Sequence, residues 1–375
     1  MGLKISFFGS SLISSYWNGT ATYFRGIIKA LNQNGHQITF YEPDVHKRKD
    51  YTDIVEPAWA KSVIYQPKKP ALFEALKKGA DADVIIKTSG VGIFDKDLEK
   101  GIIQNRKAGQ TIIFWDGDPQ ATINRFKKNS ADPLIDLIPE YDLIFTYGGG
   151  EQVASTYKSF GAKNCRPIYN AVDPEIHFPA LPDSTFDCDL AFLGNRHPDR
   201  EVRVDDFFFH AASLLPDKSF LIAGNGWEQK ITRKNIRYSG HVHINAHNIF
   251  NSTPLTVLNI CCEGVARLGF SPATRIFEAA GAGACIITDA WEGIEMFFEP
   301  GKEILIAENG REVAAILDGL APADAKRIGQ AALKRVLAEH TYEQRAKEVE
   351  NALKLRMVFR VLTGKQKRES MHRII

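Results

Sequence analysis

The sequence predicts an α/β protein made of two doubly wound domains, each with a parallel sheet covered by helices on both faces. Short apolar runs alternate with longer amphipathic ones along the chain, and the alternation is interrupted once, at the proline-rich stretch 170–187. The 375 residues suit two domains better than one core. We expect an N-terminal domain over 1–170, a linker over 171–187, a second domain over 188–340, and a terminal helix with a basic tail over 341–375.

In the first half, the spacing of hydrophobic residues predicts the strands and helices. Short apolar runs predict buried strands, and amphipathic stretches between them predict helices. The expected strands are Leu3–Phe8, Gln37–Tyr41, Val84–Lys87, Thr111–Trp115, Leu143–Tyr147 and Arg166–Tyr169. The expected helices are Trp17–Gln33, Ala71–Lys78, Lys96–Lys107 and Glu151–Phe160.

The same alternation predicts the second half. The expected strands are Leu190–Leu193, Phe220–Ala223, Ile236–Tyr238, Leu255–Asn259, Cys285–Thr288 and Glu303–Ile306. The expected helices are Arg203–Leu214, Ala273–Ala280, Arg311–Leu317 and Pro322–Glu339. Open parallel sheets bind ligands at the carboxyl ends of their strands, so the loops that follow these strands are where we expect the functional residues.

The composition excludes several classes of protein. The formal charge is only +2, which gives no support to nucleic-acid binding. The five cysteines are odd in number and lack C-x-x-C spacing, so neither a disulfide framework nor a zinc site is expected. The N-terminus lacks the layout of a signal peptide, and no apolar run is long enough to span a membrane. We therefore expect a cytoplasmic protein.

The last segment has an excess of positive charge. From Lys354 onward there are seven Lys and Arg residues and one acidic residue, Glu369. One interpretation is a helix that packs across the N-terminal domain. The other is a weak contact between this basic tail and a membrane surface or an acidic partner.

The residues from Gly269 to Asp289 form the richest motif. A turn leads into a helix whose free N–H groups would bind a diphosphate. Glu278 lies about one and a half turns further along, where its carboxylate would accept hydrogen bonds from two ribose hydroxyls. The donor-binding candidates here are Ser271, Pro272, Ala273, Thr274, Arg275 and Glu278; for Glu278 a solvated helical glutamate is the alternative.

This motif resembles the donor site of the glycosyltransferase family 1/4 superfamily, in particular its CgeB-like branch of spore maturation proteins. The resemblance continues through Phe297–Leu305 and His340–Ala346. It implies the GT-B fold, in which two Rossmann-like domains face a central cleft and a C-terminal helix crosses back to the N-terminal domain. It also implies a nucleotide-sugar donor, with uridine as the favoured base. Many relatives carry a further glutamate eight positions before the one matched by Glu278; here that position is Phe270.

Two further loops of the second half are candidates for donor binding. Gly194 and Asn195 make the turn after the first strand, and Arg196 and Arg200 can stabilise the charge that grows on a leaving nucleoside diphosphate. Relatives use basic residues in this way, although these arginines can also be surface charges, as can Arg203. His241 and Val242 follow a later strand, where relatives bind the base; a structural role for His241 is the alternative.

The N-terminal half is expected to supply the acceptor side. Gly19 and Thr20 lie in the loop that approaches the donor diphosphate in GT-B relatives. The glycines do not follow G-x-G-x-x-G, and only Glu42 comes near the acidic position of a dinucleotide site, which weakens an NAD-binding interpretation. Asp116 and Asp118 follow a strongly apolar strand, and Asp118 is our candidate for the base that deprotonates the acceptor. Both aspartates can instead shape the turn or cap a helix.

The sequence thus predicts a hexosyltransferase-like glycosyltransferase that needs neither a cofactor nor a metal. Its expected partners are a nucleotide-sugar and an unidentified acceptor, a glycan, protein or small molecule, and no nucleic acid. Asp116-Gly-Asp118 has D-x-D spacing but lies in the acceptor half, so a metal site is not expected there. Two alternatives stay open: a GT-B-type nucleotide-sugar epimerase and a non-catalytic nucleotide-sugar-binding protein.

Overall fold

The computed structural model describes residues 2–14, 20–45, 54 and 57–356. It divides the chain into two compact units, one made of residues 1–169 and 342–375 and the other of residues 170–341. The second unit therefore includes the stretch 171–187 that was expected to be a linker. Within it, Val172 N–H donates to the backbone oxygen of His340, and a bridge joins Val172 to Thr341.

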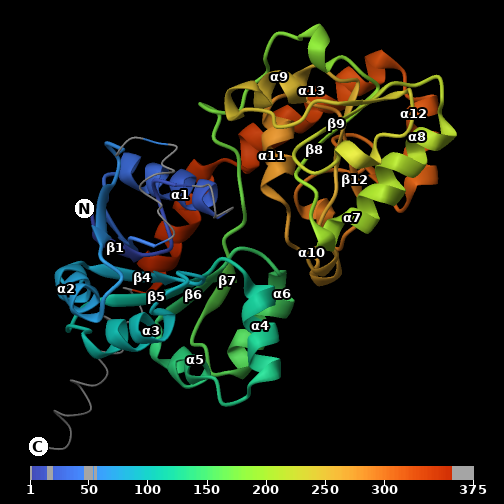
Figure 1. The fold of residues 1–375 in the computed structure, drawn as a ribbon. Coiled ribbons are helices and arrows are strands. Elements are labelled where there is room, and N and C mark those ends of the chain that lie inside the picture. Colours follow the sequence, from blue (N-terminus) through green and yellow to red (C-terminus); the bar gives the residue numbers. More distant parts are fainter. Residues whose placement is uncertain (1, 15–19, 46–53, 55–56, 357–375) are drawn as a thin grey trace, which may run out of the picture. The chain divides into compact units, whose positions relative to one another are not determined.

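The first unit is built on a seven-stranded parallel sheet in the order β3-β2-β1-β4-β5-β6-β7 (Figure 1). This is a doubly wound arrangement, in which the strand order reverses between β1 and β4. The strands are β1 (Lys4–Phe8), β2 (Gln37–Pro43), β3 (Lys61–Tyr65), β4 (Val84–Thr88), β5 (Thr111–Asp116), β6 (Leu143–Thr146) and β7 (Cys165–Pro167).

The helices of this unit pack around a core rich in aromatic residues. Trp115, on the fully buried strand β5, contacts the rings of Tyr23, Phe24 and Phe145, and its indole N–H donates to the Tyr23 hydroxyl. The helices are α1 (Ala21–Gln33), α2 (Lys69–Gly79), α3 (Asp95–Gln104), α4 (Pro119–Lys128), α5 (Pro133–Leu137), η2 (Ile138–Glu140) and α6 (Gly150–Ser159).

The chain returns to the first unit through the helical residues 342–356, drawn in red in Figure 1. This helix packs on α1: a Cβ on Gly26 would lie only 2.2 Å from the Tyr342 ring. The carboxylate of Glu350 lies 3.2 Å from His36 Nε2, and Arg356 pairs with the buried Asp142 at 2.5 Å. The interpretation of this segment as a helix on the N-terminal domain is thus confirmed, whereas the tail beyond 356 lies outside the described residues.

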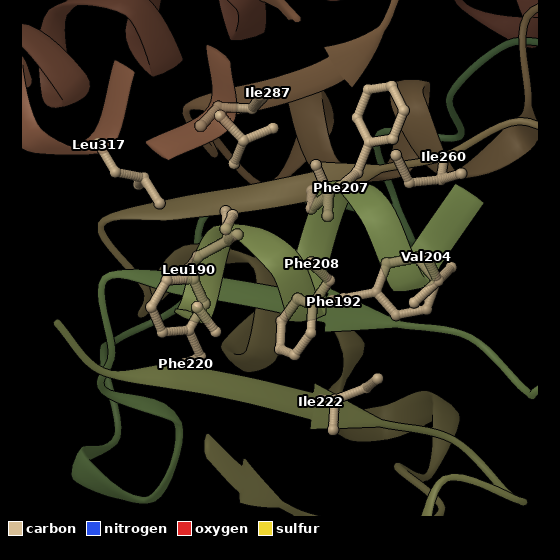
Figure 2. Close-up of a cluster of buried hydrophobic side chains, with 14 of the residues drawn as sticks. Leu190, Phe192, Val204, Phe207, Phe208, Phe220, Ile222, Ile260, Ile287 and Leu317 are labelled. Carbon is tan, nitrogen blue, oxygen red and sulfur yellow. The ribbon is translucent and has the colours of Figure 1, made fainter. Parts of the chain in front are cut away.

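The second unit is built on a six-stranded parallel sheet in the order β10-β9-β8-β11-β12-β13. Figure 2 shows the core on one side of it, where Phe207 and Phe208 pack among Phe192, Phe220 and Ile287. The strands are β8 (Leu190–Leu193), β9 (Phe220–Ala223), β10 (Ile236–Tyr238), β11 (Thr256–Asn259), β12 (Ile286–Asp289) and β13 (Leu305–Ala307).

The helices of the second unit are mostly short. The α-helices are α7 (Pro198–Val204), α8 (Ala211–Leu214), α9 (His247–Ser252), α10 (Glu263–Leu268), α11 (Thr274–Gly281), α12 (Gly310–Gly319) and α13 (Pro322–Glu339). A π-helical stretch, η4 (Asp205–His210), joins α7 to α8, and 3-10 turns lie at η3 (Ser184–Phe186), η5 (Glu228–Lys230), η6 (Ile244–Ala246) and η7 (Ile294–Met296).

The helix expected over Arg203–Leu214 was wrong in its start and in its regularity. It begins five residues earlier, because Pro198 fits the first turn and the His197 ring accepts a hydrogen bond from Asp199 N–H. Among the described residues, no helix is long and apolar enough to cross a membrane.

Candidate functional site

The carboxyl ends of β8, β9 and β10 are joined through their loops. Gly194 N–H donates to Ala223 O at 2.9 Å, and the Trp227 indole donates to Gly194 O at 2.6 Å. Gly224 has φ +111°, and a Cβ on it would lie 2.3 Å from Gly194 O, so only glycine fits. Trp227 is therefore a core residue that fixes the Gly194–Asn195 turn.

The Arg196 side chain is engaged in an ion pair. Its guanidinium donates to both carboxylate oxygens of Glu201, at 2.8 and 2.7 Å. Lys230 contacts the same carboxylate at 2.6 Å, and together the two cations lower the pKa of Glu201 to about 2. The charge of Arg196 is thus already neutralised within its own loop and helix.

Arg200 is placed differently from Arg196. Its guanidinium lies over the Phe192 ring, 5.6 Å from the centroid, and one nitrogen donates to Asn195 O at 2.9 Å. Its Nε is buried and has no hydrogen-bond partner among the described residues. Arg200 contributes to the pKa of Arg275, so the two guanidiniums are close enough to interact.

The turn before α11 brings backbone donors and unpaired side chains together. Ala273 is extended at the N-cap and gives no side-chain cap, so the first N–H groups of α11 are not capped by it. Ser271 is buried, and its Oγ has no partner among the described residues. A backbone hydrogen bond fixes the start of this turn: Phe270, in the left-handed region at φ 45°, donates its N–H to Glu292 O.

Arg275, in the first turn of α11, is a cation in a poorly solvated position. Its Nη1 is buried and unpaired among the described residues. Burial lowers the pKa of Arg275; the charge of Glu278 opposes this shift, and that of Arg200 adds to it. A buried guanidinium nitrogen without a partner costs free energy, which an anionic ligand at this place would recover.

Glu278 lies less than one turn after Arg275 on α11, next to two histidines that the sequence analysis did not select. Its carboxylate lies 3.8 Å from His177 Nε2, and its side chain is only 16% exposed. Burial lowers the pKa of His247; Glu278 opposes this shift, and Arg275 adds to it. Because His247 Nε2 lies 3.3 Å from Val242 O, the residues Val242, His247, Arg275 and Glu278 belong to one cluster.

Several expected positions are placed outside this cluster or in structural roles. The side chain of His241 is exposed. Thr274 Oγ1 accepts a hydrogen bond from Asn170, which fixes the start of α11. Arg203 pairs with the buried Asp289 at 2.6 Å.

In the first unit, Asp118 and Asp116 have different environments. Asp118 is exposed and caps α4, accepting a hydrogen bond from Ala121 N–H at 3.0 Å. Asp116 is fully buried and accepts hydrogen bonds from Tyr157 and Thr122 at 2.5 and 3.0 Å; burial raises its pKa, and these bonds oppose the shift. Asp116 is thus structural, and only Asp118 is accessible to an acceptor.

The loop after β1 is described in part. Thr20 is half-buried and lies at the N-cap position of α1, without a side-chain cap hydrogen bond. Gly19 lies outside the described residues. Glu42 accepts a hydrogen bond from Leu12 N–H at 2.5 Å, so it holds this loop in place and is not presented to a ribose. Among the described residues, no group of three or more His, Cys, Asp and Glu side chains is placed to hold a metal ion.

Two doubly wound units with parallel sheets define the GT-B fold of glycosyltransferases. Solved structures with this fold match nearly the whole chain. A sucrose-phosphate synthase from Thermosynechococcus elongatus matches with a TM-score of 0.65 and 14% identity, over 96% of this chain and 99% of that one. HepE from Anabaena, solved with UDP-glucose, matches with a TM-score of 0.67 and 11% identity, over 94% and 99%.

An α-glucosyltransferase, solved with UDP and a 13-mer DNA containing an HMU base, also matches, with a TM-score of 0.68 and 13% identity over 94% of this chain and 100% of that one. A family model described as "Glycosyl transferase-like" matches residues 200–351, which include Arg200, Arg275 and Glu278. No curated protein matches the sequence. The chain therefore has a GT-B-type fold, and its residues 200–351 match a glycosyltransferase-like family model.

Proposed function

We propose that this protein transfers a sugar, a hexose in the first instance, from a nucleotide-sugar to a hydroxyl group of an acceptor. The observation that carries the proposal is the start of α11, where the unpaired Arg275 Nη1 and Ser271 Oγ lie beside uncapped backbone N–H groups. A diphosphate supplies acceptors for all three kinds of donor. Solved neighbours with bound UDP or UDP-glucose support UDP as its carrier.

Arg275 and Arg200 would bind the diphosphate and stabilise its departure. When the glycosidic bond breaks, negative charge grows on the leaving nucleoside diphosphate, so fixed cations stabilise the transition state more than the ground state. Arg200 takes this role in preference to Arg196, whose guanidinium is neutralised by Glu201. With two guanidiniums and a helix N-terminus, the proposed reaction requires no metal ion.

Glu278 and Val242 would bind the nucleoside. Glu278 is on the same helix as Arg275, less than one turn further on, and its carboxylate would accept hydrogen bonds from both ribose hydroxyls. The backbone of Val242 would contact the base, and the hydrogen bond to His247 fixes that backbone. The exposed side chain of His241 would cover the solvent-facing side of the bound base. In the first unit, Gly19 and Thr20 are the proposed diphosphate contacts.

Asp118 would deprotonate the acceptor. One of its carboxylate oxygens accepts the Ala121 N–H, and the side chain is exposed at the carboxyl end of β5. The sugar is therefore proposed to pass to a hydroxyl that donates its proton to this carboxylate. Membership of the CgeB-like branch and a cytoplasmic location belong to the same proposal.

One observation favours epimerisation of a nucleotide-sugar as a second candidate function. His177 and His247 lie beside Glu278, and Phe270 stands where many transferases carry a further glutamate. GT-B-type epimerases use carboxylates and a histidine around the sugar. A non-catalytic protein that only binds the nucleotide-sugar is the remaining alternative.

Incubation with donors alone separates these three functions. A thermal-shift screen with UDP-, GDP-, dTDP- and ADP-sugars first identifies the donor, because binding raises the melting temperature by mass action. A transferase then hydrolyses the donor slowly or leaves it intact until an acceptor is added, an epimerase converts it into its epimer, and a binding protein only binds it. The proposal is wrong if no nucleotide-sugar raises the melting temperature, or if the donor is epimerised.

A further inference from the structure

The first unit contains a pocket whose lining includes none of the residues proposed above to bind the nucleotide. It lies at the carboxyl ends of β4 and β5, and its walls come from α3, α4 and α5. Its volume is about 230 Å³, below the roughly 300–1,000 Å³ of pockets that take drug-sized ligands. The pocket therefore suits a small molecule, or the end group of a larger one.

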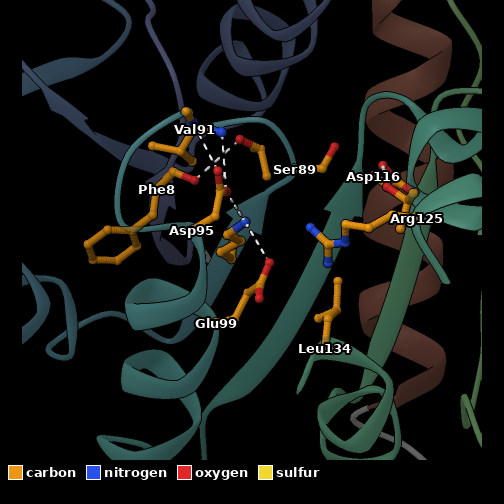
Figure 3. A network of polar contacts seen from close by, with 12 residues as sticks. Phe8, Ser89, Val91, Asp95, Glu99, Asp116, Arg125 and Leu134 are labelled. Atoms are coloured by element: carbon orange, nitrogen blue, oxygen red, sulfur yellow. Dashed lines mark hydrogen bonds and ion pairs between the residues drawn. The ribbon is translucent and has the colours of Figure 1, made fainter. Parts of the chain in front are cut away.

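Charged side chains of both signs line this pocket. Lys87, at 0% exposure, lies 2.6 Å from Asp95 and 3.3 Å from Glu99, and its ammonium sits over the Phe114 ring. Burial raises the pKa of Glu99, although the positive charges of Lys87 and Arg125 act against the shift. In Figure 3, Asp95 and Glu99 lie on one side and the Arg125 side chain points toward them from the other.

These charges are already neutralised within the unit, which limits the ligands that the pocket can select. Lys87 has two carboxylate partners, and Arg125 pairs with the buried Asp132 at 3.1 Å. The carboxylates of Asp95, Glu99 and Asp118 would repel an anion, while the positive charges of Lys87 and Arg125 would repel a cation. A hydroxyl group both donates and accepts, so a set of hydroxyls can use carboxylate oxygens and cationic N–H groups without adding charge.

We propose that this pocket binds a small neutral molecule with several hydroxyl groups, such as a sugar ring or a polyol. Asp118 is one of the lining residues. If the chain is the transferase proposed above, the bound polyol is the acceptor. Only this assignment as acceptor rests on the proposed function. Its reacting hydroxyl would then lie near the carboxylate that takes up the proton.

Binding can be measured on the whole protein without any nucleotide. D-glucose and myo-inositol are the neutral probes, and glucose 6-phosphate and glucosamine are charged probes of similar size. In saturation-transfer NMR titrations, we expect at least one neutral probe to bind saturably, with at least tenfold higher affinity than either charged probe. Tighter binding of a charged probe, or no saturable binding of either neutral probe, would overturn the proposal.

A pair of variants on α4 locates the binding. Ala121 is exposed and lines the pocket, so Ala121→Phe fills it, while Asn124→Phe adds the same ring outside the lining. We expect at least a tenfold loss of polyol affinity in Ala121→Phe and less than a twofold change in Asn124→Phe. Ala121→Gln serves if the Phe variant does not fold. Equal polyol affinity in Ala121→Phe and the wild type would show that the polyol binds elsewhere.

Nucleotide-sugar binding in the same variants keeps this proposal separate from the proposed function. Both variants should retain the donor affinity of the wild type. If no nucleotide-sugar binds while Ala121→Phe abolishes polyol binding, the transferase proposal fails and the polyol pocket remains. If the donor binds and the polyols do not, the pocket proposal fails alone.

Discussion

Arg275 has opposite expected effects on stability and on binding. Without a ligand, its Nη1 is buried and unpaired among the described residues, which disfavours the folded state. With the proposed diphosphate bound, the same nitrogen would gain a charged acceptor. A residue that lowers stability for the sake of binding is characteristic of a functional site.

Arg275→Met should therefore raise stability while it weakens binding. The unfolding free energy of the ligand-free protein is expected to rise by about 1–2 kcal/mol, because a buried unsatisfied group is replaced by an apolar one. UDP affinity is expected to fall at least tenfold in calorimetric titrations. Arg311→Met, at an exposed position on α12, is the control and should change neither quantity. A less stable Arg275→Met variant with full UDP affinity would contradict this account.

Glu278→Ala tests the ribose contact. The ribose hydroxyls lose a charged acceptor worth about 1.5–3 kcal/mol, so UDP affinity should fall roughly 10- to 150-fold. Glu295→Ala removes an exposed glutamate from the same unit and should leave the affinity unchanged. Titration of UDP against both variants gives the comparison. A folded Glu278→Ala variant with wild-type affinity would remove this residue from the site.

Asp118→Asn and Asp116→Asn should separate catalysis from stability. Asparagine caps helices as well as aspartate does, so Asp118→Asn should keep the melting temperature, while transfer falls by about 100- to 10,000-fold. Asp116→Asn places an amide NH₂ among hydroxyl donors and should cost about 1–3 kcal/mol of stability. Initial rates of transfer and thermal unfolding are the two measurements. Near-normal transfer in Asp118→Asn would mean that the base lies elsewhere.

At the scale of single elements, α9 contributes His247 to the cluster that also contains Val242, Arg275 and Glu278. Burial lowers the pKa of His247, so the unfolded chain takes up a proton at higher pH than the folded one. Its contribution to stability is complete above about pH 6.5 and is lost as the pH falls from there toward the lowered folded pKa.

His247→Gln should therefore flatten the pH dependence of stability. The glutamine amide can still donate to Val242 O but does not titrate. In urea unfolding, the difference in stability between wild type and variant is expected to move in favour of the variant as the pH falls from 7.5 to 5.5. A difference that stays constant over this range would show that His247 has the same pKa in both states.

The sequence predicted the elements of the second unit closely where a hydrophobic run has clear ends. Leu190–Leu193, Phe220–Ala223 and Pro322–Glu339 have the bounds that the pattern indicated. Strand β3 was missed because its sequence, Lys-Ser-Val-Ile-Tyr, is half polar, as suits the edge of a sheet. Helix α4 was missed because its polar residues, Gln120 and Asn124 among them, obscure a narrow buried face.

The sequence indicated most of the candidate site through the local motif in and before α11. Ser271, Arg275 and Glu278 are near one another in sequence, so this pattern indicated them together, and the loops after two strands indicated Arg200 and Val242. His177 and His247 reach the same cluster from distant parts of the chain, and no local spacing indicates such a contact. The sequence did not indicate the pairing of Arg196 with Glu201 either. A spacing of five residues across a helix start allows such a pair but does not predict it.

At the scale of the whole molecule, the first unit is discontinuous in sequence. It needs the helical residues 342–356 to cover α1, and side chains of that helix such as Ala346 and Val349 are 0% exposed. The second unit is made from one continuous stretch. Damage to the last helix should therefore affect the two units unequally.

Ala346→Asp should destabilise the first unit by at least about 3 kcal/mol, because an unpaired charge replaces a fully buried methyl group. UDP binding should persist in weakened form, since Arg275 and Glu278 belong to the other unit and only the proposed contacts of Gly19 and Thr20 would be lost. Glu343→Asp, at an exposed position of the same helix, is the control. Hydrogen exchange of the two units reports each stability separately, and equal loss of protection in both would contradict the prediction.

This discontinuity also affects the order in which a ribosome can complete the two units. The strands of the first unit leave the exit tunnel first, but the helix that covers α1 is synthesised only after the 172 residues of 170–341. At about 5–20 residues per second, this delay is about 9–34 s. During that time the apolar face of α1 is not yet covered by the last helix, while the second unit can already fold. The unit whose synthesis begins first is therefore the unit that is completed last.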